Sequence, residues 1–135
     1  MEWISRFLPG VGEYLEAEFD EIQSITEFNF ASENTSLDTY PFRQAVWMHV
    51  LRLHGLLRED YDHSQVPFYL NARVRDFVGK VARRPACLDS RDFQWFGFEL
   101  RVDERVHVAL LAAEARKQAV LVHALHRVSH YADGR

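Results

Sequence analysis

The stretch RKQAVLVHALHRVSHY, from Arg116 to Tyr131, carries the side chains of this chain that are best suited to chemistry. Imidazoles bind metal ions or transfer protons near neutral pH, and guanidinium groups hold phosphates with paired hydrogen bonds. The histidines of the stretch are His123, His126 and His130. On a helix, His123 and His130 lie about 10.5 Å apart along the axis, too far to share one ion. We therefore predict no metal site and no cofactor.

Two arginine–histidine pairs have a spacing that occurs in a nuclease family. Six residues separate Arg116 from His123, and five separate Arg43 from His49. Both pairs resemble the Arg-x(4–6)-His motif of the HEPN nucleases, small helical domains that usually dimerise. The resemblance implies that Arg116 stabilises the phosphate and that His123 is the general acid and base of metal-independent RNA cleavage. Such an RNase, or an RNA-binding subunit, is our alternative hypothesis for the function.

Basic side chains line up on one side of two predicted helices, counted at 100° per residue. The residues of these two stripes are Arg73, Lys80, Arg84, Arg116, Arg127 and His130. Such stripes could follow the phosphates of a nucleic acid by charge alone, which gives the alternative hypothesis an RNA-binding surface. The net charge of −4 argues against it, because nucleic-acid-binding domains are usually basic. A solvated helix face would show the same pattern.

Acidic residues are concentrated in the first 40 residues, where nine carboxylates accompany a single base, Arg6. The other 95 residues hold 15 basic and 11 acidic side chains, so the two parts have opposite charge. In the segment EYLEAEFDEI the carboxylates are those of Glu13, Glu16, Glu18, Asp20 and Glu21. A helix with this row of carboxylates could occupy a basic groove on a partner protein. The other interpretation is that the acidic segment packs across the basic part of the same chain.

Length and composition are those of a folded chain with one core. The 135 residues fit a single domain, residues 1–135, and 47% of them are hydrophobic. Cys87 is the only cysteine and cannot form an internal disulfide, which indicates a reducing compartment. No run of about 18 apolar residues occurs, so we expect no membrane association and a cytoplasmic protein.

The elements that must position these side chains follow from the spacing of the apolar residues. Three- and four-residue steps predict a short acidic helix over residues 11–23, central helices over 41–58 and 67–84, and a long helix over 104–131. Two-residue alternation predicts short strands over residues 25–30 and, in FGFELRV, over 96–102. A lone strand leaves its backbone unpaired, so we expect the two strands to pair with each other or across a homodimer.

The sequence thus predicts a mostly α, α+β fold. We expect a compact helical domain of about four helices, with a short two-stranded β element and a long C-terminal core helix. Apolar arcs on both sides of the basic stripe indicate that this last helix is wedged between other elements. We expect a small non-catalytic interaction protein, such as an inhibitor, an adaptor or a complex subunit, that contacts a protein or ribonucleoprotein partner through its charged surface. No strong catalytic motif indicates an enzyme.

Overall fold

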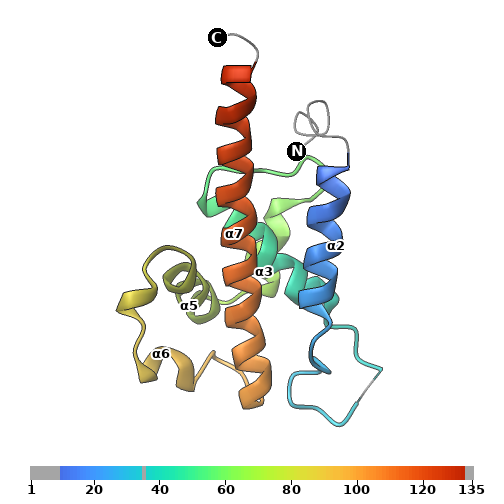
Figure 1. Ribbon diagram of the computed structural model, residues 1–135. Helices are drawn as coiled ribbons and strands as arrows, with labels where there is room; N and C mark the ends of the chain where they lie inside the picture. Colours follow the sequence, from blue (N-terminus) through green and yellow to red (C-terminus); the bar gives the residue numbers. More distant parts are fainter. Residues whose placement is uncertain (1–9, 35, 133–135) are drawn as a thin grey trace.

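A computed structural model of the chain describes residues 10–34 and 36–132, which form helices joined by loops (Figure 1). The α-helices are α2 (Val11–Gln23), α3 (Tyr40–Leu53), α4 (Val66–Tyr69), α5 (Ala72–Arg83), α6 (Ser90–Gln94) and α7 (Val102–Ala132). Two 3₁₀ turns, η1 (His63–Gln65) and η2 (Pro85–Cys87), lie between them. The predicted helical class and the long C-terminal helix are confirmed. Arg6, the base of the acidic segment, lies outside the described residues.

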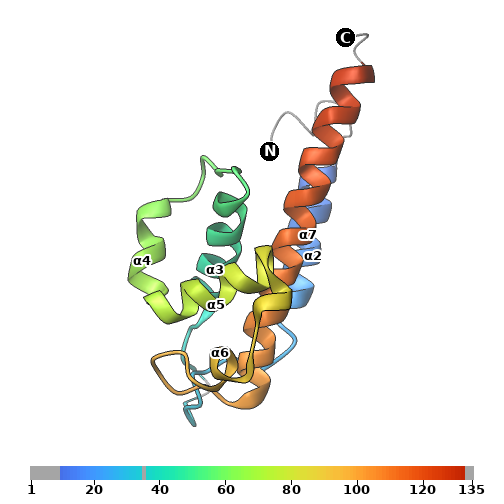
Figure 2. The same cartoon turned by 90° about the vertical axis from the view of Figure 1, so that its left-hand side faces the viewer.

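The long helix α7 is the axis around which the other helices pack. α2 runs antiparallel along one side of it, and α5 ends against it, as the two views in Figures 1 and 2 show. The inward side chains of α7 follow three- and four-residue steps, as expected for a helix with one buried face. They are Val108, Leu111, Ala112, Ala115, Ala119 and Val122. Beyond these residues the last turns of α7 extend past the other helices (Figure 1).

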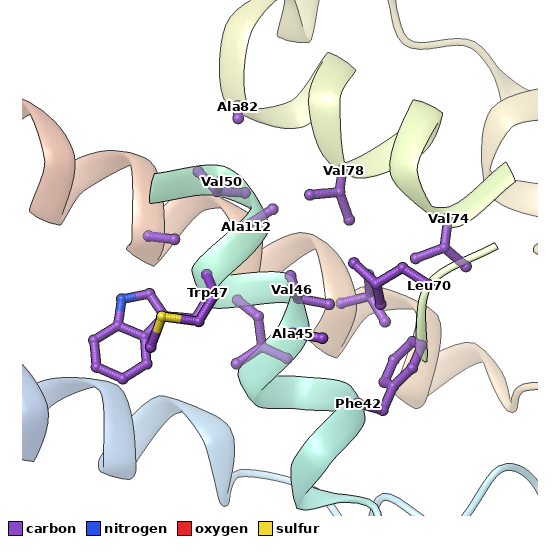
Figure 3. Close-up of a cluster of buried hydrophobic side chains, with 14 of the residues drawn as sticks. Phe42, Ala45, Val46, Trp47, Val50, Leu70, Val74, Val78, Ala82 and Ala112 are labelled. Atoms are coloured by element: carbon purple, nitrogen blue, oxygen red, sulfur yellow. The ribbon is translucent and has the colours of Figure 1, made fainter. Parts of the chain in front are cut away.

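The core lies where α3 meets α5 and α7. Figure 3 shows Val46 and Val50 of α3 on the side that faces Val78 of α5, and all three side chains are fully buried. Aromatic stacking joins α2 to this core, because the rings of Phe19 and Trp47 lie 4.1 Å apart and nearly parallel. Removing this apolar surface from water is the main force that holds the helices together, at about 25 cal/mol per Å².

The predicted two-stranded β element is wrong, because the described residues contain no strand. Residues 25–31 form a loop instead, in which Phe30 and Ala31 have φ angles of 55° and 57°. The backbone N–H groups of Asn29, Phe30 and Ala31 all donate to the carboxylate of Glu104, not to a neighbouring strand. The Glu104 side chain therefore accepts the backbone hydrogen bonds that a paired strand was expected to accept.

The FGFELRV segment, residues 96–102, does not form the second predicted strand either. Phe96 and Leu100 are buried, as the alternation predicts, whereas Val102 is exposed at the start of α7. Gly97 has a φ of 90°, which interrupts extended backbone, and the Asn71 side chain donates to the carbonyl of Phe96 (2.8 Å). The two-residue alternation therefore belongs to an irregular loop that packs along the core, and its backbone does not pair with another strand.

The central helices are also shorter than predicted, and the described residues hold six α-helices where the sequence indicated about four. α3 ends at Leu53, before Gly55 with its φ of 79°. The second predicted helix is divided into α4 and α5, since Leu70 is extended and the Asn71 side chain caps α5 by accepting from the Val74 N–H. The unpredicted α6 starts with a capping box of two aspartates.

α7 is buried along one side only, so the expectation that it is wedged between other elements is wrong. Leu110 is 44% exposed, while its neighbour Leu111 is fully buried. The other exposed large apolar side chains of this helix are Val102, Val106, Val120, Leu121, Val128 and Tyr131. Among the described residues, neither α7 nor any other helix is long and apolar enough to cross a membrane.

Candidate partner-binding surface

α2 turns its apolar side to the core and its acidic side to solvent. Leu15 and Phe19 are fully buried, and Gln118 of α7 donates a hydrogen bond to the carbonyl oxygen of Leu15 (3.0 Å). The helix carries five carboxylates and no basic residue. Because the apolar residues recur at three- and four-residue steps, the carboxylates are left on the remaining sides of the helix.

Two of the five carboxylates are matched by basic groups of the same chain. Glu18 accepts a hydrogen bond from Lys117 of α7, and this contact raises the pKa of the lysine. Glu16 pairs with Arg58 at 2.8 Å, although half of the Glu16 side chain stays exposed. Arg58 also pairs with Asp60 at 2.7 Å. The idea that the acidic segment packs on the basic part of the chain therefore holds for these residues.

The other three carboxylates of α2 face outward. Glu13, Asp20 and Glu21 are exposed, and no basic group of residues 10–34 and 36–132 pairs with them. Tyr14 lies beside them with 63% of its surface accessible. We call Glu13, Glu16, Asp20, Glu21 and Tyr14 the acidic surface. Of the predicted partner-binding residues, only Glu18 is turned inward.

The predicted basic stripe on α5 is partly neutralised within the fold. Lys80 pairs with Asp92 at 2.8 Å and with Asp76 at 3.6 Å, and these carboxylates raise the pKa of the lysine. Arg73 and Arg84 are exposed. Only part of the positive charge on this stripe is therefore available to a nucleic acid.

The basic stripe on α7 faces solvent and not the acidic helix. Arg116, His123, Arg127 and His130 are all exposed, whereas it is Lys117 that contacts α2. The Nε2 of His123 lies 2.7 Å from the carbonyl oxygen of His54, and since a carbonyl can only accept, this nitrogen carries the proton. The structure thus brings Arg116 and His123 to one exposed side of α7, and RNA cleavage by this pair stays a hypothesis.

The second HEPN-like pair is not brought together. Six positions along a helix rotate His49 by about 240° from Arg43. Arg43 binds the carbonyl oxygen of Gln23 at 2.6 Å and the hydroxyl of Thr39 at 3.2 Å. Burial lowers the pKa of His49, and the nearby Arg75 lowers it further. Arg43 therefore holds the end of α2, and His49 belongs to the packing of α3.

A buried carboxylate, which the sequence patterns did not single out, ties the loop of residues 25–31 to α7. Glu104 is fully buried, and its oxygens accept from the N–H groups of Asn29, Phe30 and Ala31 at 2.7–2.8 Å. The N–H group of Arg101 donates to it as well, at 2.9 Å. A glutamate in the first turn of a helix is ordinary in sequence, and only its position four residues before the buried Val108 could have indicated burial.

The same loop has a second attachment and a small pocket. The Nε2 of His107 lies 2.7 Å from the carbonyl oxygen of Ile22 and must carry the proton, so its Nδ1 accepts from the hydroxyl of Thr26 (2.6 Å). Burial lowers the pKa of His107, which keeps the ring neutral. The adjacent pocket of about 220 Å³ is lined by Glu27, Phe28, Asn29, Leu37, Asp38, Thr39 and Arg43.

The described residues define a helical protein with one acidic helix face and one exposed basic side. A family model described as PA26 p53-induced protein (sestrin) matches residues 1–132. The chain is 36% identical over 134 residues to a sestrin homolog of Dictyostelium discoideum. It is 32% identical to human Sestrin-2 and 30% identical to Sestrin-1 of Xenopus laevis, each over 128 residues.

This chain belongs to the sestrin family. The alignments cover 99% of the chain with the Dictyostelium protein and 95% with the two vertebrate proteins. They cover 22% of the Dictyostelium relative and 26% of each vertebrate one. The chain therefore spans about a quarter of the length of these relatives.

Proposed function

We propose that this chain is a non-catalytic interaction protein that binds a basic surface of a partner protein through the acidic surface of α2. The unpaired carboxylates of α2 are the observation that carries the proposal. Glu13, Asp20 and Glu21 have no basic partner among the described residues. Glu16 lies between Glu13 and Asp20 at three- and four-residue steps, and its charge is only partly offset because it shares Arg58 with Asp60. Like charges at this spacing destabilise a helix. A cationic partner would relieve this repulsion and would be steered to the surface by its charge.

The composition of the acidic surface suits a protein partner more than a single cation. Tyr14 offers a large, exposed aromatic ring beside the carboxylates, and tyrosine is enriched among the residues that dominate binding energy in protein interfaces. The family description refers to induction by p53, which agrees with a protein whose role is regulatory. The exposed thiol of Cys87 suits a reducing compartment, so we propose the cytoplasm as its location.

The experiment compares two triple charge reversals. The test variant carries Glu13→Lys, Asp20→Lys and Glu21→Lys. The control carries Glu33→Lys, Glu59→Lys and Glu99→Lys, which changes the net charge equally at exposed positions outside α2. Tagged wild-type chain first captures its protein partner, and the dissociation constant of the purified pair is then measured for each variant. Circular dichroism verifies that both variants fold.

We expect the α2 reversal to weaken the purified pair by at least about tenfold, which is 1.4 kcal/mol, while the control binds like the wild type. Binding of the wild-type chain should also weaken as salt is added, because exposed charges are screened. Equal losses in both variants would show that only the total charge matters. An α2 reversal that binds like the wild type would overturn the proposal.

A further inference from the structure

The outer side of the layer formed by α2 and α7 carries an exposed row of apolar side chains. In Figure 2, α3, α4 and α5 lie to one side of this layer, and no described helix lies on the other side. The exposed apolar residues of α7 that face outward there share one side of the helix. We call them the apolar strip: Val106, Leu110, Ala113, Leu121, Ala124, Val128 and Tyr131.

The spacing of the apolar strip is that of a seam between two long helices. Its residues recur at three- and four-residue steps, as in helices that pack along their whole length. Lys117 occupies the one remaining step of the series and binds Glu18 of α2. From Val106 to Tyr131 the strip is about 37 Å long at 1.5 Å per residue. An exposed apolar surface of this extent is typical of an interaction site.

Opposite charges border the two edges of the apolar strip. Lys117 and Gln118 both contact α2, so this edge continues into the acidic surface. Arg116 lies one further step of about 100° around α7 and therefore faces away from α2. Arg127 of the same basic stripe lies over the ring of Tyr131, with its Cζ 5.8 Å from the ring centre. The order across the outer side is thus acidic, apolar and basic.

The acidic and basic edges also overlap along the length of α7. Gln118 donates to the carbonyl oxygen of Leu15, and Lys117 donates to Glu18, so the middle of α2 lies level with these two residues of α7. Arg116 precedes them directly and lies at the same height on the opposite edge. The two edges therefore carry opposite charges at matching positions.

This arrangement is complementary to itself in one orientation of two copies. A twofold axis parallel to α7 sets the apolar strips against each other and the acidic edge of each copy against the basic edge of the other. A twofold axis across α7 sets like charges against each other instead. A different protein would need both charged edges in this order and at this separation, whereas a second copy has them by symmetry. The charges therefore favour a second copy with the two long helices parallel.

We propose that this chain forms a parallel homodimer, in which the apolar strips of two α7 helices pack together and the acidic surface of each copy contacts the basic stripe on α7 of the other. The dimer rests on the proposed function, because the second copy is the basic partner of the acidic surface. We expect a dissociation constant of about 10–100 μM, since alanines make small contacts and exposed ion pairs contribute little.

The dimer is tested by sedimentation velocity of the 135-residue chain with complementary charge reversals. The α2 reversal is the one defined above, with its own control. The α7 reversal consists of Arg116→Glu and Arg127→Glu. Its matched control changes two exposed arginines outside α2 and α7, as Arg73→Glu and Arg84→Glu. Circular dichroism verifies that every variant folds.

We expect the wild type and both controls to dimerise as the concentration rises. Each reversal alone should dimerise at least about tenfold more weakly, because its two edges then carry the same charge. An equimolar mixture of the two reversals should regain dimers, since every edge again meets its opposite. A wild-type chain that stays monomeric at about 1 mM would overturn the dimer, as would a mixture that associates no better than its components.

Failure of the dimer and failure of the proposed function give different results. A monomeric wild-type chain whose captured partner is a different protein, and whose α2 reversal weakens that pair, would overturn the dimer and support the proposed function. An α2 reversal that leaves both the captured pair and the dimer unchanged would overturn both.

Single cysteines test the parallel orientation. In a Cys87→Ser background, Ala113→Cys and Ala124→Cys are prepared one at a time and oxidised. Each residue meets its own counterpart across a parallel seam, so we expect both variants to form disulfide-linked dimers. The exposed Glu99→Cys, outside the apolar strip, is the control and should stay unlinked. Antiparallel helices can bring at most one of the two positions to its counterpart, so linkage of only one, or of neither, would overturn the parallel arrangement.

Discussion

Glu104 illustrates how much a single residue can decide in this fold. A buried carboxylate is costly unless hydrogen bonds compensate for its lost hydration, and here backbone N–H groups from two segments do so. The same bonds allow Phe30 and Ala31 to keep positive φ angles, which non-glycine residues rarely adopt. The carboxylate is therefore what gives the loop of residues 25–31 its shape.

Replacing Glu104 by glutamine tests this role. The variant keeps the size of the side chain but removes its charge and turns an NH₂ group toward N–H donors that need an acceptor. We expect the free energy of unfolding to fall by about 3 kcal/mol. Urea denaturation followed by circular dichroism measures it. The exposed Glu99→Gln should stay within about 0.5 kcal/mol of the wild type, and a similar small change in Glu104→Gln would contradict our account of the loop.

At the scale of elements, α7 shows that an apolar pattern does not reveal which side of a helix the fold covers. Its two apolar arcs look alike in sequence, yet α2, α3 and α5 pack on only one of them. Leu110 and Leu111 are neighbours of the same residue type on opposite sides of this division. They offer a matched pair for measuring what burial contributes.

The pair leads to a prediction about two single substitutions. Leu111→Ala leaves a cavity in the core and should lower the free energy of unfolding by about 2–5 kcal/mol. Leu110→Ala removes a partly solvated side chain and should cost about 1 kcal/mol or less. Chemical denaturation of both variants at the same protein concentration makes the comparison. Equal costs that grow with protein concentration would mean that a second copy covers the exposed arc in solution.

The sequence predicted most helices because helical periodicity records burial directly, as in Leu15 and Phe19 of α2 or Leu111 of α7. It failed where side chains replace regular backbone pairing. The Glu104 carboxylate binds one predicted strand, and the Asn71 amide binds the other at Phe96. Neither interaction has a local signal, because the partners are 75 and 25 residues apart.

The sequence predicted the residues of the candidate partner-binding surface about as completely as it predicted the helices. The acidic residues of α2 were identified by type and spacing, and four of the five do face solvent at least in part. The inward turn of Glu18 depends on Lys117, 99 residues later. Likewise, Arg116 and His123 were recognised as one stripe, but the contact of His123 with the carbonyl oxygen of His54 arises only through the packing of α3 on α7.

For the whole molecule, partly or fully buried histidines make the stability depend on pH. Burial lowers the pKa of His49, His54 and His107 in the folded state. The unfolded chain, with histidine pKa values near 6.5, therefore binds protons more readily than the folded chain does. Stability should be complete above about pH 6.5 and should decrease as the pH falls below that value, until the folded-state histidines are protonated as well.

Urea titrations at pH 7.5, 6.5 and 5.5 check this direction. We expect the urea midpoint to fall toward pH 5.5, and the decrease to be smaller in His107→Gln, whose neutral side chain cannot take up the proton. His130→Gln, at an exposed position, is the control and should keep the full decrease. A midpoint that rises with acidification would contradict the assigned direction.

The pairing of α2 with α7 also has a consequence for the order in which the chain is made. Leu15 and Glu18 leave the ribosome about a hundred residues before Gln118 and Lys117, their partners in the fold. At roughly 5–20 residues per second, the first helix waits about 5–20 s for the last. During that time the apolar side of α2, with Leu15 and Phe19, has no complete core to cover it.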